Sequence, residues 1–257
     1  MDHILFLAAL ALHAASPNAL ELESGTDLSA LFAEQVDRRL EFTDDQRNEY
    51  AERLSAALAA VGLADAGPQY FVLVDIAPKA QAAMIYWKSP DGELHLIGAS
   101  PASTGRPGEF EHFVTPTGVF EHSIANLDFR AEGTKNEYGV RGYGVKGMRV
   151  YDFGWQRAAR GWGGHGESMM RLQMHATDPD MLESRLGTRQ SKGCIRIPAT
   201  LNVLIDRYGL LDADYEQAAA QGKHLWVLRP DRQPTPWSGR YLIIVDSRQA
   251  HRPKAAP

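Results

Sequence analysis

In the first quarter of the chain, apolar residues recur every three or four positions, a spacing that gathers them on one face of an α-helix. Two such stripes predict two helices in an N-terminal segment spanning 27–63, and Thr43 with Gln46 matches the capping box that would open the second helix. Gly67 and Pro68 then mark a boundary with the rest of the chain. The apolar positions are Leu28, Leu31, Phe32 and Val36 in the first stripe and Tyr50, Leu54, Leu58 and Val61 in the second.

After this boundary the pattern changes to short runs rich in β-branched and aromatic residues, which predicts a mainly β domain over 70–246. The polar and basic residues 247–257 are predicted to form a mobile tail. The elements expected within the domain are strands at 70–76, 84–87, 94–98, 224–229 and 240–245, and helices at 198–208 and 212–221.

At the N-terminus, residues 4–15 form an almost entirely apolar run that only His13 interrupts. A run of this length is typical of a signal-peptide h-region and is too short to cross a membrane. We therefore predict a signal peptide over 1–18, which implies a periplasmic or secreted protein with no integral membrane span. The alternative is a short buried helix, because no Lys or Arg precedes the run.

Overall composition narrows the classes of protein to consider. The chain has 257 residues with 44% hydrophobic content, which is ample for a core. Its net charge of -5 and the absence of a basic run argue against a nucleic-acid-binding protein, whose affinity would rest on clustered Lys and Arg. The single cysteine excludes an intrachain disulfide.

That cysteine, Cys194, lies in the run SKGCIRI, nineteen positions after His175. A thiol, an imidazole and a glycine-containing turn are the parts of a cysteine nucleophile site. The thiolate is the reactive form of cysteine. We therefore expect the nearby cations Arg189, Lys192 and Arg196 to favour ionisation of Cys194.

Just before His175, apolar residues at 170, 172 and 174 alternate with polar residues at 171, 173 and 175. This alternation predicts a strand whose end carries His175 on the polar face, where it can act as a base for Cys194. The commoner roles remain alternatives, since a lone cysteine is usually a small buried side chain and a lone histidine usually a surface or core group. A zinc site of His165, His175 and Cys194 is a further alternative, although no familiar metal spacing appears.

Together these segments resemble the active-site signature of the L,D-transpeptidase catalytic domain, the YkuD-like family. Its members carry a histidine, a small residue and a threonine at a strand end, then Ser-His-Gly-Cys or a variant, a β-branched residue and an arginine. This chain departs from the commonest form at Ala176, where glycine is frequent, and at Lys192, where histidine is frequent. The matching residues are His175, Ala176 and Thr177, followed by Ser191, Lys192, Gly193, Cys194, Ile195 and Arg196.

A second pair of segments agrees with this resemblance. The family has a Ser-x-Gly strand end followed by Thr-Pro-x-Gly-x-Phe, and the chain is similar at 103–105 and 115–120. Taken alone, such glycine and proline punctuation would indicate an ordinary hairpin loop. The resemblance covers residues 70–208. It implies a fold with a curved mixed sheet or barrel-like sandwich and peripheral helices.

The resemblance implies a peptidoglycan L,D-transpeptidase that needs neither a metal nor another cofactor. Its substrates would be peptidoglycan stem peptides, and the protein would be associated with the cell wall. Cys194 would attack the bond between the diamino acid and D-alanine of a tetrapeptide stem, giving a thioester that an amine acceptor resolves. His175 would transfer the protons, and backbone N–H groups at Gly193 and Cys194 would hold the oxyanion.

Three flanking residues complete the expected site. Ser191 is expected to order the loop or His175 rather than to act as a nucleophile, and Arg196 and Lys192 are candidates to bind the terminal carboxylate of the donor. Arg196 has an equally good alternative role as a hydrogen-bond donor to the loop backbone.

Other functions share these residues. An L,D-carboxypeptidase, or an amidase that cleaves a protein-to-wall linkage, would use the same site with water as acceptor. A cell-wall-binding module without catalytic activity is an alternative from another class.

Residues 126–166 hold ten glycines and many aromatic residues, and we expect a lid or cleft wall over the thiol there. His165 within that segment is either part of the site or a solvent-exposed loop residue.

Overall fold

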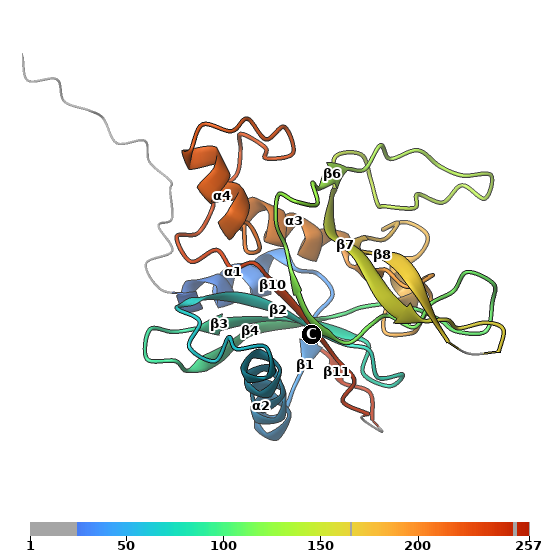
Figure 1. Ribbon diagram of the computed structural model, residues 1–257, viewed down its shortest axis with the longest axis horizontal. Helices are drawn as coiled ribbons and strands as arrows, with labels where there is room; N and C mark the ends of the chain where they lie inside the picture. The colour runs from blue at the N-terminus through green and yellow to red at the C-terminus, as the bar shows by residue number, and fades with distance from the viewer. Residues whose placement is uncertain (1–24, 165, 249–250, 257) are drawn as a thin grey trace, which may run out of the picture.

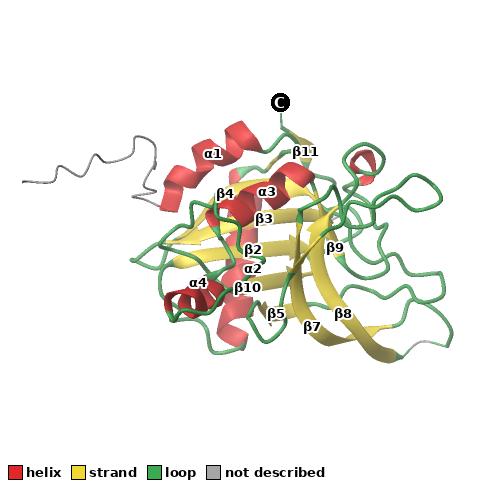
Figure 2. Ribbon diagram, turned by 90° about the horizontal axis from the view of Figure 1, so that it is seen from above, coloured by secondary structure: helices red, strands yellow, loops and turns green. Residues whose placement is uncertain are grey.

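The computed structural model describes residues 25–164, 166–248 and 251–256 and shows a mainly β protein, as the sequence predicts. Two sheets carry most of the strands, and helices pack around them (Figure 1). Figure 2 shows the strands of the smaller sheet running across the ends of the strands of the larger one. The signal peptide predicted at 1–18 and His165 lie outside the described residues.

The larger sheet has the strand order β4-β3-β2-β10-β5. At its centre, β2 pairs antiparallel with β3 and parallel with β10. Both faces of β2 are buried, which explains why its sequence is a continuous apolar run rather than an alternation. The strands predicted at 70–76, 84–87, 94–98 and 240–245 are confirmed, and the sheet gains one strand that was not predicted. The confirmed strands are β2 (Gln69–Asp75), β3 (Ala82–Lys88), β4 (Leu94–Pro101) and β10 (Tyr241–Val245), and the additional strand is β5 (Gly118–Glu121).

The smaller sheet has the order β6-β7-β8-β9. β7 and β8 form a long antiparallel pair, and β9 lies parallel to β8 on its other side. The segment 126–166, where a lid or cleft wall is expected, is not one continuous loop, because β6 and β7 fall within it. The bounds are β6 (Phe129–Arg130), β7 (Arg149–Ala159), β8 (Glu167–Ala176) and β9 (Ile195–Ile197).

The helices follow the predicted order. Thr43 and Gln46 form the expected capping box, with each side chain bonded to the backbone N–H of the other. Val61 departs from the second apolar stripe because it follows the helix and is 53% exposed. No helix in the described part of the chain is long and apolar enough to cross a membrane. The bounds are η1 (Gly25–Asp27), α1 (Leu28–Gln35), α2 (Asp44–Ala60), η2 (Glu183–Arg185), α3 (Ala199–Tyr208) and α4 (Ala213–Ala220).

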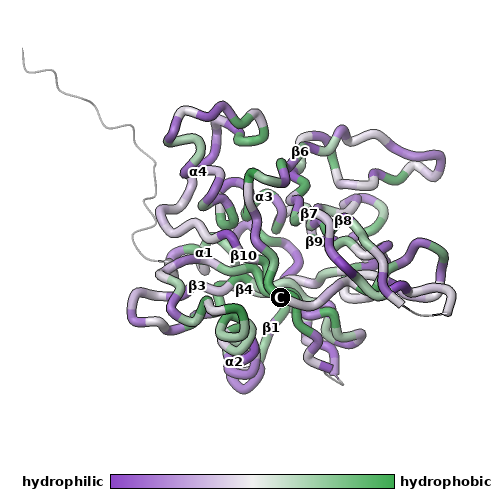
Figure 3. Tube along the Cα trace, viewed as in Figure 1, coloured by the Kyte–Doolittle hydropathy of each residue, from purple (hydrophilic) through white to green (hydrophobic). Residues whose placement is uncertain are grey.

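The two faces of β2 divide the hydrophobic core. Tyr70, Val72 and Val74 pack in a cluster with residues of α1, α3 and the smaller sheet. Phe71 and Leu73 point to the opposite face and pack in a cluster with residues of α2. Figure 3 shows hydrophobic residues concentrated along the central strands and many hydrophilic residues in the outlying loops.

Three features differ from the expectations. The strand predicted at 224–229 is wrong, since this segment forms turns whose buried residues Leu225 and Val227 pack with Tyr215 of α4. Part of the tail predicted to be mobile forms β11 (Lys254–Ala255), which pairs with β1 (Leu40–Glu41). Within the described residues, the sheets stay open and close no barrel.

A buried ion-pair network joins the smaller sheet to the helices. Arg149, at the start of β7, is fully buried and donates to Asp128 at 2.6 Å, to Asp212 at 2.7 Å and to Asp206 at 3.3 Å. Its guanidinium also lies 4.9 Å from the ring centre of Tyr215. Because desolvating a cation is costly, Arg149 can be buried only with these partners in place.

Replacing Arg149 with methionine is expected to lower the free energy of unfolding by about 3–5 kcal/mol, because carboxylates packed around it lose their counter-charge. Urea unfolding measures this difference. Arg157→Met is the matched control on the same strand, since Arg157 is 75% exposed and its ion pair among the described residues is with the exposed Glu167. It should change stability by less than about 1 kcal/mol. Similar losses in the two variants would contradict the structural role of the network.

Candidate active site

The parallel pairing of β8 with β9 brings His175 and Cys194, the two residues singled out in the sequence, to one face of the smaller sheet. His175 pairs with Arg196, and Met174 pairs with Ile195. Paired residues of adjacent strands point to the same face. Met174 and Ile195 are buried in the core, so His175 and Arg196 face the other way. Cys194 directly precedes β9, and its thiol lies 3.8 Å from the carbonyl oxygen of Arg171 on β8.

His175 is held in one tautomer at the end of β8. Its Nδ1 lies 2.7 Å from the carbonyl oxygen of Ala176, so Nδ1 carries the proton and Nε2 has a free lone pair. Burial lowers the pKa of His175 to about 4, against the opposing effect of this hydrogen bond. The imidazole is therefore neutral at pH 7 and is able to accept a proton.

Cys194 is a neutral thiol in the resting protein. Burial raises the pKa of Cys194, and this effect exceeds the opposing effects of the Gln173 backbone and of Arg196. The expectation that three cations promote ionisation is wrong for two of them. Arg189 donates to the carbonyl oxygen of Ile76, and the exposed Lys192 ammonium lies 3.5 Å from Glu111.

The turn before Cys194 is held by Ser191. Its hydroxyl donates to the carbonyl oxygen of Cys194 at 2.5 Å and accepts from the N–H of Gly193 at 3.0 Å. These bonds fit the loop-ordering role expected of Ser191. They also engage the Gly193 N–H, which the sequence-based mechanism had assigned to an oxyanion. Gly193 has φ +137°, and a Cβ there would lie 2.8 Å from the Met170 side chain, so only glycine fits.

The second pair of segments named in the sequence supports this same turn. The N–H of Ser191 donates to the carbonyl oxygen of Thr104. The hydroxyl of Thr115 accepts from the N–H of Gly105 at 2.8 Å and donates to the carbonyl oxygen of Gly193 at 2.7 Å. The 103–105 strand end and Thr115 therefore fix the backbone on which Cys194 is presented.

Sequence reasoning missed two contributors to the site. Asp152 accepts hydrogen bonds from Arg171 and Gln173, the polar neighbours of His175 along β8. Its charge also contributes to raising the pKa of Cys194. The ring of Tyr143 packs edge-on against His175, with centroids 4.7 Å apart. The alternation along β8 pointed toward Gln173 and Arg171, but nothing in the sequence marked Asp152, which lies at an irregularity in the β7–β8 pairing.

Arg196 fits both roles considered for it. The half-buried guanidinium donates to the carbonyl oxygen of Gln190 at 3.4 Å, a bond to the loop backbone. Its Nε is buried and has no hydrogen-bond partner among the described residues. Burial lowers the pKa of Arg196, and the nearby Cys194 and Tyr143 oppose this. A positively charged group with a free donor thus lies close to the thiol.

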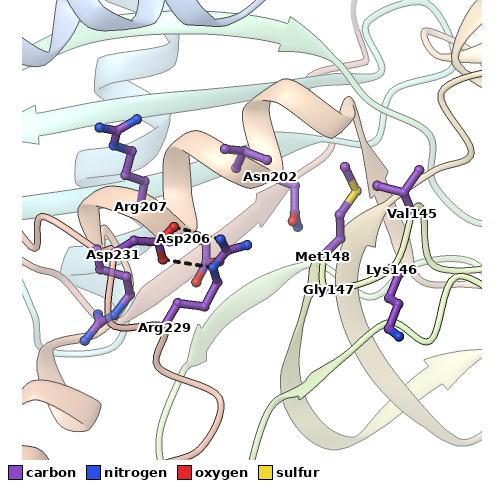
Figure 4. Close-up of a pocket in the computed structure, with 11 residues that line it drawn as sticks. Val145, Lys146, Gly147, Met148, Asn202, Asp206, Arg207, Arg229 and Asp231 are labelled. Carbon is purple, nitrogen blue, oxygen red and sulfur yellow. Dashed lines mark hydrogen bonds and ion pairs between the residues drawn. The ribbon is translucent and has the colours of Figure 1, made fainter.

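A pocket of 310 Å³ between α3 and the loops around it is a separate feature (Figure 4). Its charged side chains do not converge. Figure 4 shows Arg229 bonded to Asp231, with Arg207 and Lys146 pointing away from that pair. Neither Cys194 nor His175 lines this pocket, so it is not part of the candidate site.

The described residues contain no cluster of three His, Cys, Asp or Glu side chains suited to a metal ion. Since His165 lies outside these residues, the zinc hypothesis that includes it stays a hypothesis.

Comparison with known proteins adds little to this geometry. No protein-family model matches the chain, and no curated protein matches it in sequence. Among solved structures, it is similar to the crystal structure of the helical cell shape determining protein Pgp2 from Campylobacter jejuni, with a TM-score of 0.32 and 13% identity. The match covers 91% of this chain but 59% of that one, so the chain spans under two thirds of that protein. A likeness this weak carries no argument about fold or function.

The buried neutral His175 predicts a specific loss of stability in acid. Its pKa is about 4 in the folded protein and about 6.5 when unfolded, so the unfolded state binds more protons between these values. As pH falls from 6.5 to 4, this residue should lower the unfolding free energy by about 3 kcal/mol. Urea unfolding at several pH values should show that His175→Gln removes this slope while leaving the curve above pH 7 parallel to that of the native protein. Parallel curves throughout would show that His175 is not buried in its neutral form.

Proposed function

We propose that this chain is a cysteine acyltransferase of the L,D-transpeptidase type that acts on peptidoglycan stem peptides. One observation carries the proposal: Cys194 and a neutral His175, with a free Nε2 lone pair, are brought to one face by adjacent parallel strands. A thiol, a base in the correct tautomer and a fixed turn are what covalent acyl transfer requires. We further propose that the two open sheets are this family's catalytic fold, and that the enzyme works in the periplasm or outside the cell.

The reaction begins from a neutral pair. Nε2 of His175 takes the thiol proton as the sulfur of Cys194 attacks the carbonyl between the diamino acid and the terminal D-alanine. A tetrahedral intermediate forms, and its oxygen carries the negative charge. Because the Gly193 N–H is engaged by Ser191, the N–H of Cys194 is the remaining donor of the expected pair.

Collapse of the intermediate breaks the amide bond. His175 returns its proton to the departing amine of D-alanine, which leaves a thioester on Cys194. An amine acceptor then attacks the thioester, its proton passes to His175, and the thiol is regenerated with a new amide bond. Water in place of the amine would release a tripeptide, which is the carboxypeptidase reaction.

Mass spectrometry tests this sequence of steps. The protein is incubated with disaccharide tetrapeptide and a free D-amino acid, beside a Cys194→Ala control. We expect exchange of the terminal residue and a thioester adduct on the intact protein, both lost in the control. Tripeptide without exchange would instead identify a carboxypeptidase. Absence of both turnover and adduct on tetrapeptide would contradict the proposal, and cross-linked or protein-linked wall fragments would then test the amidase alternative.

The two cations expected to bind the donor carboxylate should behave differently. Arg196 has a buried Nε without a partner, whereas Lys192 is exposed and lies beside Glu111. A lost charge-assisted bond costs about 1.5–3 kcal/mol, so Arg196→Gln should raise the KM for tetrapeptide about tenfold or more. Lys192→Gln, the matched control in the same loop, should leave KM within about twofold, since exposed pairs contribute little. Equal effects in steady-state kinetics would contradict the assignment of Arg196.

A further inference from the structure

A second pocket, of 490 Å³, is lined in part by Tyr143, whose ring packs against His175. It is formed by β6, by the glycine-rich segment that follows it and by the loop after α4. Its lining includes the aromatic residues Phe129, Tyr143 and Trp226 and the polar residues Glu132 and Thr134. A volume of this size is in the range of pockets that take small organic ligands.

Trp226 is held outward by its surroundings. It is 61% exposed, while its neighbours Leu225 and Val227 are 9% and 2% exposed and pack against α4. The Nε and Nη2 of Arg130 both donate to the carbonyl oxygen of Val227, which ties this loop to β6. A large aromatic side chain is thus presented at the pocket on an anchored backbone, and exposed apolar surface of this kind marks binding sites.

One aromatic ring separates this pocket from the candidate active site. Tyr143 lines the pocket and packs edge-on against Phe129, with centroids 5.4 Å apart. The same ring packs against His175 at 4.7 Å. A ligand in the pocket would therefore lie next to a substrate whose reacting bond is at Cys194.

The mixture of groups selects a ligand with an apolar face and a polar rim. Aromatic rings pack well against the C–H face of a pyranose, and a carboxylate and a hydroxyl can bond its hydroxyl groups. Glu132 adds negative charge, and the Arg130 guanidinium that also lines the pocket is paired with Asp206, so the described lining disfavours phosphate and other anions. We propose that this pocket binds a saccharide ring of the glycan strand that carries the stem peptide. This inference rests on the proposed function and adds a glycan contact to its substrate.

Two substrates separate the roles of the pocket and of the active site. Trp226→Ala should raise the KM for disaccharide tetrapeptide about tenfold, because one stacking contact is lost, and should leave kcat unchanged. The KM for free tetrapeptide should not change. Tyr138→Ala is the control, since Tyr138 is 76% exposed in the same glycine-rich segment but does not line the pocket. Equal effects of Trp226→Ala on both substrates, or on neither, would overturn the proposal.

A binding measurement tests the pocket without turnover. Chitotetraose is titrated into Cys194→Ala protein and binding is followed by tryptophan fluorescence. Saturable binding that Trp226→Ala weakens about tenfold supports the saccharide site. If no peptide is turned over but this binding persists, the proposed function fails and the pocket stands. Absence of chitotetraose binding, or binding of an alkylammonium probe that Glu132→Gln abolishes, would overturn the saccharide assignment.

Discussion

The candidate site depends on the short parallel pairing of β9 with β8. Three residue pairs join the strands, from Met174 with Ile195 to Ala176 with Ile197. Their inward side chains fill the core between the sheets, and this fixes which face His175 and the segment before Ile195 present. A slip of one residue would turn Cys194 into the core and expose apolar side chains. Burial of the inner face therefore specifies the register, and the register positions the chemistry.

Burial also sets the charge state of the pair. Close packing of Tyr143 and the neighbouring strands removes His175 from water, and the same environment raises the pKa of Cys194. Both effects disfavour ions, so Cys194 is a neutral thiol and His175 a neutral imidazole in the resting protein. In the proposed reaction the proton must therefore move during attack, which makes the Nε2 lone pair of His175 the decisive feature of the candidate site.

Local patterns predicted those elements that depend on local physics. The capping box at Thr43 and the alternation that ends at His175 were readable because spacing alone decides them. The prediction of a strand at 224–229 was wrong because the alternating apolar residues there pack against α4 and do not pair with a neighbouring strand. The prediction that Cys194 is ionised was wrong chiefly because burial, which the sequence does not show, raises the pKa of the thiol. Sequence proximity placed Lys192 near the thiol, but its side chain lies beside Glu111, and only the fold shows that.

The sequence also could not predict which residues of distant segments the fold brings to the candidate site. Asp152 reaches the site because β7 and β8 pair with an irregularity beside it, and no sequence pattern encodes that irregularity. The glycine-rich segment was expected to cover the thiol. It contains β6 and β7, and it supplies Tyr143, whose ring packs against His175. Tyr143 is thus the residue through which the glycine-rich segment contacts both His175 and the second pocket.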